Sequence, residues 1–402
     1  MSVTPEKQAI RPFTFEISDA ELKDLRARIL ATRFPEKETV ADQSQGTQLA
    51  TIQELARYWA TEYDWRKVEA KLKAVPNFVT EIDGLDIHFI HVRSKHENAL
   101  PLIVTHGWPG SIIEQLKIIE PLTNPTAHGG DASDAFHVVI PSMPGYGFSG
   151  KPTATGWNPE RIARAWAELM KRLGYTKYVA QGGDWGAVIT DIMGVQEPEG
   201  LVGIHTNMPG IFPPAVEQAI AAGNPLPSDV VLSDEEQKHA VEQLDFFYRH
   251  VYYAYLMGSR PQTLTGLVDS PVGLAAFLLD HDRDSLDLIS RSFAGEIQGL
   301  TRDDVLDNIT LFWLTNTAVS ASRLYWEGAQ AGTAFFSVRG VRIPVAVSVF
   351  PDELYQAPKS WAEQAYPNLV HYNKLPKGGH FAAWEQPELL VNEVRAGFRR
   401  LR

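Results

Sequence analysis

The 402-residue sequence contains no cysteine. This absence excludes disulfide bonds, a thiolate nucleophile and cysteine-ligated metals, so packing alone must hold the fold together. It suits a reducing cytoplasm, which is where we expect the protein to act. The chain also lacks any apolar run of the ~18 residues needed to span a bilayer, and its first residues carry charges instead of a signal-peptide core. We therefore expect no membrane anchor.

Positive charge is scarce as well. Lysine and arginine number 37 against 49 aspartate and glutamate residues, which gives a formal net charge of -12. The phosphates of a nucleic acid would be repelled, and no lysine- or arginine-rich run overrides the balance. We expect no nucleic-acid partner, whereas a small neutral substrate is compatible with the charge. A chain of this length predicts one large catalytic unit with additions.

The first part of the chain predicts two amphipathic helices. Ser18 and Glu21 are spaced as a capping box, and an apolar stripe follows at Leu22, Leu25 and Ile29. A second stripe comprises Leu49, Ile52, Leu55 and Trp59. Such helices need a surface to bury against, so we expect residues 1–97 to form a meander wrapped around the core domain. Within this segment, Asp83 and Gly84 separate two β-rich runs and predict a hairpin turn.

The middle of the chain alternates short apolar runs with helical patterns. The predicted strands are residues 102–105, 136–140, 178–180 and 201–205, and sheet character returns at 343–350 and 369–375. This alternation predicts an α/β fold with a mostly parallel sheet and helices on both faces. The aromatic-rich helical sequence between the two groups of strands predicts an inserted cap. We therefore divide the chain after the meander into a first core part (98–208), a helical cap (209–332) and a second core part (333–402).

The most specific local pattern is the sequence GGDWG at residues 182–186, directly after a predicted strand. Its small residues stand two positions on either side of Asp184, as in the strand-turn-helix elbow that presents a nucleophile. A carboxylate with an ordinary pKa of about 3.9 is ionised at neutral pH and attacks without a base. Its natural targets are sp3 carbons, because the resulting alkyl ester can then be hydrolysed. A glycine-rich turn with a capping Asp is the alternative interpretation.

Two further motifs stand in the order expected around such an elbow. Residues 106–110 (HGWPG) follow a strand where the oxyanion loop belongs, so the backbone N–H groups of Trp108 and Trp185 are expected to converge. Residues 378–381 (GGHF) place His380 on a loop after the last strand, and Asp352 and Glu353 follow the strand before it. The order of nucleophile, acid and histidine is that of a hydrolase triad.

At these residues the sequence resembles the microsomal-type epoxide hydrolases of the α/β-hydrolase superfamily, from about Arg11 to the C-terminus. The resemblance extends to residues 64–65 (DW), 144–149 (PGYGFS) and 269–276 (DSPVGLAA). It implies hydrolysis of a small hydrophobic epoxide by water, with no cofactor and no metal. Membrane-anchored members carry an apolar N-terminal segment that is missing here. A homodimer is compatible with the sequence, which does not fix the oligomeric state.

The resemblance also implies two cap tyrosines that bind the epoxide oxygen. It places one at Tyr253, with Tyr252 and Tyr255 as the nearest alternatives, and the other at Tyr325. It selects Glu353 as the triad acid, although Asp352 beside it remains an alternative. In the resulting hypothesis, Asp184 opens the ring and His380 activates water. A haloalkane dehalogenase and a catalytically silent binding protein of the same fold are the rival interpretations.

Overall fold

The computed structural model describes residues 5–333, 335–336 and 339–402. Within this part of the chain, a nine-stranded sheet has the order β1-β2-β3-β5-β4-β6-β7-β8-β9. The strands from β4 to β9 run parallel to one another, whereas β1, β2 and β3 pair antiparallel at one edge, as do β3 and β5. The strands are β1 Arg11–Pro12, β2 Asn77–Ile82, β3 Leu85–Val92, β4 Leu100–Thr105, β5 Phe136–Pro141, β6 Tyr178–Gly182, β7 Leu201–Thr206, β8 Val345–Val349 and β9 Leu369–Lys374.

Helices cover both faces of the sheet, as the alternation predicted. Helices α6 and α7 pack together, and α7 lies on β4, β6 and β7. Helices α5 and α17 pack together on the other face, where α17 contacts β7, β8 and β9. The central strands β6 and β8 are buried along their whole length, which explains their short continuous apolar sequences. The core helices are α5 Leu116–Thr123, α6 Pro159–Arg172, α7 Trp185–Gln196, α15 Lys359–Ala365, α16 Ala382–Glu385 and α17 Pro387–Phe398, with short 3-10 turns at Pro125–Ala127, Ala132–Asp134 and Arg399–Leu401.

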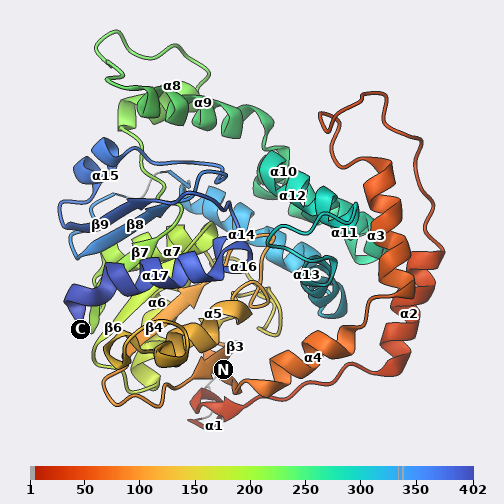
Figure 1. Ribbon diagram of the computed structural model, residues 1–402, viewed down its shortest axis with the longest axis horizontal. Helices are drawn as coiled ribbons and strands as arrows, with labels where there is room; N and C mark the ends of the chain where they lie inside the picture. Colours follow the sequence, from red (N-terminus) through yellow and green to blue (C-terminus); the bar gives the residue numbers. More distant parts are fainter. Residues whose placement is uncertain (1–4, 334, 337–338) are drawn as a thin grey trace.

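The chain leaves the sheet after β7 and returns at β8, and the described residues in between form mostly helices joined by loops, as predicted. Helices α10 and α14 pack against each other in this cap and approach the sheet beside α13 (Figure 1). The cap elements are α8 Pro214–Ala221, α9 Glu235–His250, α10 Tyr252–Ser259, the 3-10 helix η3 Pro261–Val268, α11 Pro271–Leu279, α12 Arg283–Phe293, α13 Arg302–Leu314 and α14 Ala318–Ala331. No helix in the described part of the chain is long and apolar enough to cross a membrane.

The helices of the N-terminal meander contact the cap. The capping box of Ser18 and Glu21 is present, α2 and α3 pack on α11 of the cap, and α4 packs on α13 (Figure 1). Long-range hydrogen bonds fix this arrangement: Trp59 Nε1 donates to Thr310, and the Tyr63 hydroxyl donates to Asp307. The helices are α1 Pro5–Gln8, α2 Asp19–Leu30, α3 Leu49–Thr61 and α4 Trp65–Ala74.

The N-terminal segment also contributes strands to the central sheet. Strands β2 and β3, joined by the predicted hairpin turn, belong to this sheet. Their backbone hydrogen bonds pair β3 with β5 of the core. Residues 5–97 therefore contribute an edge of the sheet as well as helices that support the cap, and the division of the chain at residue 97 stays a prediction.

Candidate active site

Asp184 occupies a sharp turn between strand β6 and helix α7. Strand β6 ends at Gly182 and α7 begins at Trp185, so the chain changes from strand to helix within two residues. The turn holds Asp184 at φ 51° and ψ -130°, an uncommon conformation for a residue with a side chain and one found at functional sites. A Cβ at Gly182 would collide with the carbonyl group of Gly186. This steric conflict explains the small residues of the motif.

The Asp184 carboxylate faces the loop that follows β4. The backbone N–H of Trp108 donates a hydrogen bond of 2.7 Å to Asp184 Oδ1. Position 107 accommodates only glycine, because a Cβ there would overlap the carboxylate. The structure thus brings the first predicted oxyanion donor into contact with the predicted nucleophile. The N–H of Trp185 lies in the first turn of α7, where helix N–H groups have no partner within the helix, and its role stays a prediction.

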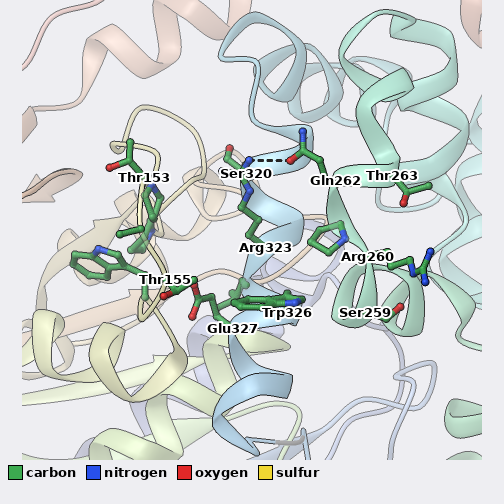
Figure 2. Close-up of a pocket in the computed structure, with 16 residues that line it drawn as sticks. Thr153, Thr155, Ser259, Arg260, Gln262, Thr263, Ser320, Arg323, Trp326 and Glu327 are labelled. Atoms are coloured by element: carbon green, nitrogen blue, oxygen red, sulfur yellow. Dashed lines mark hydrogen bonds between the residues drawn. The ribbon is translucent and has the colours of Figure 1, made fainter.

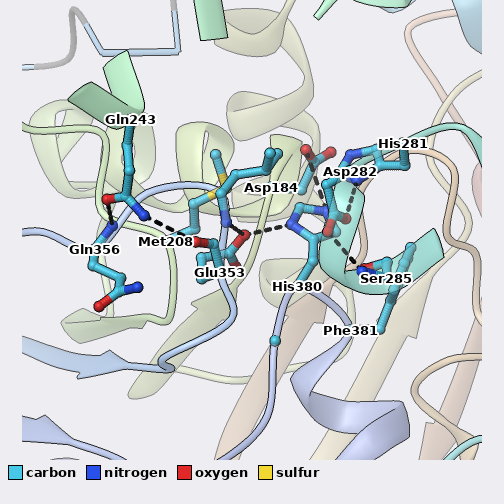
Figure 3. Close-up of polar contacts among 12 residues, drawn as sticks. Asp184, Met208, Gln243, His281, Asp282, Ser285, Glu353, Gln356, His380 and Phe381 are labelled. Atoms are coloured by element: carbon cyan, nitrogen blue, oxygen red, sulfur yellow. Dashed lines mark hydrogen bonds and ion pairs between the residues drawn. The ribbon is translucent and has the colours of Figure 1, made fainter. Parts of the chain in front are cut away.

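His380 lies between Asp184 and Glu353 in the core. Its Nδ1 is 2.6 Å from Glu353 Oε1, and its Nε2 is 3.7 Å from Asp184 Oδ2 (Figure 3). All three side chains are buried. Asp352 is exposed to solvent and makes backbone contacts to the loop of residues 378–379. The geometry therefore pairs His380 with Glu353 and leaves Asp352 outside the cluster.

Two carboxylates control the charge of His380. Burial disfavours its imidazolium form, but the negative charges of Glu353 and Asp184 outweigh that effect and raise the pKa of His380 to about 10. At neutral pH the histidine is therefore protonated and forms an ion pair with Asp184. This state suits a carboxylate nucleophile, because the imidazolium places a positive charge beside Asp184 in a buried site.

Tyr253 and Tyr325 face each other above the elbow, from helices α10 and α14. Their ring centroids are 6.2 Å apart, and the ring of Trp108 lies 4.7 Å from the first and 5.9 Å from the second. Burial, followed by the charge of Asp184, raises the pKa of both phenols well above its usual range, so both remain hydrogen-bond donors. Tyr252 and Tyr255, the alternatives, are 70% and 78% exposed.

Two family models match the chain. The model described as epoxide hydrolase N terminus matches residues 10–115, and the model described as alpha/beta hydrolase fold matches residues 101–387. Epoxide hydrolase 1 of Oryctolagus cuniculus is 35% identical, over 97% of this chain and 88% of that protein. A protein of Stigmatella aurantiaca (strain DW4/3-1), provisionally named an epoxide hydrolase, is 52% identical over 98% of this chain and 86% of its own length.

The chain belongs to the epoxide hydrolase family. Among solved structures, the juvenile hormone epoxide hydrolase of the silkworm Bombyx mori has a TM-score of 0.85 and 31% identity, with 99% of this chain and 97% of that chain covered. The epoxide hydrolase of Aspergillus niger has a TM-score of 0.81 and 29% identity, with coverages of 98% and 97%. The α/β-hydrolase fold expected from the sequence is confirmed.

A second histidine enters the active site of this epoxide hydrolase from the cap. His281, in the turn between α11 and α12, has its ring centroid 4.1 Å from that of His380, with the ring planes tilted by 36°, and its ring stacks on that of Tyr253 at 5.2 Å. Figure 3 shows it beside the Asp184 carboxylate. His281 is absent from the residues predicted from the sequence, because one histidine between two cap helices carries no motif. The signal available was the adjacent Asp282, which also has an ordinary interpretation as the N-cap of α12.

Asp282 holds His281 in place. Its Oδ2 is 2.8 Å from His281 Nδ1, while its Oδ1 accepts from the backbone N–H of Ser285. Burial alone would raise the pKa of Asp282. The hydrogen bond and charge of His281, together with the charge of His380, outweigh burial and lower this pKa to about 2. Asp282 is therefore ionised at neutral pH. The site contains two histidine–carboxylate pairs, one from the core and one from the cap.

The only group of potential metal ligands found in the described part of the chain lies at the same place. Asp184, His281 and His380 each offer one ligand atom, and these atoms lie within 4.8 Å of one another. Imidazole nitrogen and carboxylate oxygen are ligands that zinc accepts. The expectation of a site without a metal stays a prediction.

Two cavities flank the site. A cavity of about 640 Å³ lies between the loop of residues 152–157 and the elements α10, η3 and α14 (Figure 2). Its wall includes Arg323 and Leu324, which precede Tyr325 on α14, but none of the predicted site residues. A much smaller cavity, of about 20 Å³, is lined by Asp184 and His380 themselves.

Proposed function

We propose that the protein converts an epoxide into a vicinal diol through a covalent alkyl ester on Asp184. One observation carries this proposal: the Asp184 carboxyl group at the elbow is 3.7 Å from a histidine that Glu353 binds at 2.6 Å. A carboxylate nucleophile forms the ester without a base, and the histidine–glutamate pair supplies the base that hydrolyses it. The family relatives named as epoxide hydrolases support the same reaction class.

The first step forms one carbon–oxygen bond and breaks another. Asp184 Oδ2, the oxygen not bound by Trp108, attacks a ring carbon of the epoxide, and the bond from that carbon to the ring oxygen breaks. Tyr253 and Tyr325 donate hydrogen bonds to the oxygen as it gains negative charge. Their raised pKa supports this role, because both phenols keep their protons at neutral pH. Paired donors of this kind fit an oxygen leaving group better than a halide.

The second step returns the enzyme to its starting state. Ester formation removes the negative charge of Asp184, which is one cause of the raised pKa of His380, so the histidine becomes easier to deprotonate. The proton that His380 loses neutralises the ring-opened alkoxide. Neutral His380 then takes a proton from water as the water oxygen attacks the carbonyl carbon of the Asp184 ester. The N–H groups of Trp108 and Trp185 stabilise the tetrahedral oxyanion. Collapse breaks the bond to the alkyl oxygen, which takes the proton from His380 as the diol leaves. The proton left on the Asp184 carboxyl group passes to His380, which restores the carboxylate and the imidazolium.

The lining of the site indicates a small hydrophobic epoxide. The rings of Phe277 and Tyr253 contact Trp108, and Tyr325 and Phe335 contact Trp185. Apolar surface of this kind favours an uncharged substrate. No cofactor takes part in either step.

Replacing His380 by Gln tests the mechanism. Asp184 should still form the ester, but water activation is lost, so the covalent intermediate should accumulate and appear by mass spectrometry as protein plus substrate on residue 184. His239→Gln, on an exposed part of α9, is the matched control and should turn over normally. Normal turnover by the His380 variant, or a folded variant that never forms an ester, would contradict the proposal.

A further inference from the structure

The small cavity beside the nucleophile has the size and polarity of a site for one water molecule. Its volume of about 20 Å³ exceeds the ~10–15 Å³ that a single water requires. Asp184 and His380 line it on one side, and the side chains of Glu114, Gln115, Gln181 and Asn207 contribute polar groups around it. A buried water needs two to four polar partners, which this lining provides.

Glu114 and Gln115 form a pair in the wall of this cavity. Both side chains are buried, and Gln115 Nε2 donates a 2.7 Å hydrogen bond to Glu114 Oε1. The carboxyl group lies over Gly110, where a Cβ would overlap its second oxygen. Gln115 Oε1 is buried and has no hydrogen-bond partner among the described residues. A buried acceptor of this kind costs free energy unless a molecule in the cavity satisfies it.

The charge state of Glu114 is compatible with its place beside the nucleophile. Burial raises its pKa to about 8, an effect that the charge of Asp184 strengthens and that His380 and Gln115 oppose. At neutral pH the carboxyl group is therefore mostly protonated. It does not repel Asp184, and it can both donate and accept a hydrogen bond.

We propose that this cavity holds the water that hydrolyses the Asp184 ester, and that Glu114 and Gln115 are catalytic residues that orient it. The assignment rests on the proposed function. The water directs one hydrogen toward His380 Nε2, which takes that proton, and the other toward an oxygen of the Glu114–Gln115 pair. Its lone pair then points at the carbonyl carbon of Asp184, where the new carbon–oxygen bond forms. Water thus approaches from the core, while the epoxide approaches from the cap and its tyrosines.

Single-turnover kinetics with excess enzyme separate the two steps. Glu114→Leu should form the ester at the wild-type rate and hydrolyse it about 100-fold more slowly, the cost of misplacing a reacting atom by about 1 Å. Gln115→Leu, which removes the unpaired oxygen, should also slow hydrolysis selectively. Glu114→Gln keeps a polar group of the same size and should recover most of the lost rate.

Gly110→Ala tests the position of Glu114 without changing its chemistry. The added Cβ would displace the Glu114 carboxyl group, so this variant should reproduce the selective loss of hydrolysis. Glu120→Leu, an exposed glutamate on the neighbouring helix α5, is the control and should leave both steps unchanged.

The outcomes separate this inference from the reaction on which it rests. Wild-type hydrolysis in Glu114→Leu and Gln115→Leu would overturn the water site, and so would equal slowing of both steps, because a structural role has no reason to spare ester formation. If His380→Gln never accumulates an ester, the proposed function itself fails. Selective loss in the Leu variants, with rescue by Glu114→Gln, supports the assignment.

Discussion

The ring of His281 from the cap packs against that of His380 from the core, with 4.1 Å between the ring centroids. Because His281 is bound to Asp282, this contact brings a third carboxylate close to the predicted base. The charge of Asp282 adds to those of Glu353 and Asp184 in raising the pKa of His380. A residue of the cap therefore helps to set the proton affinity of a residue in the core.

Asp282→Asn should lower the pKa of His380, because it removes a negative charge that favours the imidazolium. Ester hydrolysis requires neutral His380, so the pH at which hydrolysis reaches half its maximum rate should move to lower values. Asparagine is also a good N-cap and can keep the hydrogen bond to Ser285, so folding should change little. The measurement is the pH dependence of ester decay in single turnovers.

Asp284→Asn is the control for this experiment, because Asp284 is an exposed acid in the first turn of the same helix. This substitution should not change the pH at which ester hydrolysis reaches half its maximum rate. If that pH is also unchanged in the Asp282 variant, the cap does not influence His380.

Substitution of Glu353 and of Asp352 should have very different consequences. Glu353→Gln removes the charge bound to His380 Nδ1, so it should slow ester hydrolysis about 100-fold or more while ester formation continues. Asp352→Asn alters an exposed side chain and should stay close to the wild-type rate. Rapid-quench measurement of the two steps in both variants checks this. The reverse result would identify Asp352 as the acid.

Features of the fold and site that depend on local sterics could be predicted from the sequence. The hairpin turn at Asp83 and Gly84 has positive φ at both residues, which Asp and Gly favour. The elbow around Asp184 was recognisable because small residues are required within two positions of it. In both cases the sequence restricts the backbone over a few neighbouring residues, so no knowledge of distant contacts is needed.

Features that depend on contacts between distant segments could not be predicted in this way. The helices before residue 75 show apolar stripes, but a stripe does not reveal whether the cap or the core covers it. The family resemblance selects Glu353 over Asp352, but only the fold shows that Glu353 is buried against His380 while Asp352 is exposed. The site at Glu114 and the contact of His281 with His380 join segments from separate parts of the chain, and neither carries a motif.

Tyr253→Phe and Tyr325→Phe should slow ester formation and leave ester hydrolysis and folding almost unchanged. Each removes one hydrogen-bond donor from the oxygen that leaves the ring carbon, and losing such a donor costs on the order of 100-fold. Each single effect should be smaller than this, because two donors share the charge. Stopped-flow measurement of the intrinsic tryptophan fluorescence on mixing with an aryl epoxide follows the step.

Tyr252→Phe and Tyr255→Phe are matched controls on the same helix as Tyr253, and both side chains are exposed. They should form the ester at the wild-type rate. Wild-type rates in Tyr253→Phe and Tyr325→Phe too would remove the tyrosines from the mechanism.

The source of the diol oxygen distinguishes the covalent route from direct attack by water on the epoxide. In the covalent route, water attacks the carbonyl carbon of the Asp184 ester, so the new diol oxygen comes from the carboxylate and the water oxygen stays in the enzyme. A single turnover with excess enzyme in heavy-oxygen water should therefore place the label in Asp184 and leave the diol nearly unlabelled. Over many turnovers the label should pass into the product.

Direct attack predicts the reverse pattern, because a water activated by His380 would deliver its oxygen to the diol in the first turnover. Fragmentation of the peptide that contains α7 locates the label, and Asp191 on the same helix is an internal reference that should stay unlabelled in either route. Its carboxylate accepts from the Tyr366 hydroxyl and lies outside the residues that line the reacting cavity. Label in the diol from the first turnover, with none in Asp184, would reduce Asp184 to an orienting group and refute the ester mechanism.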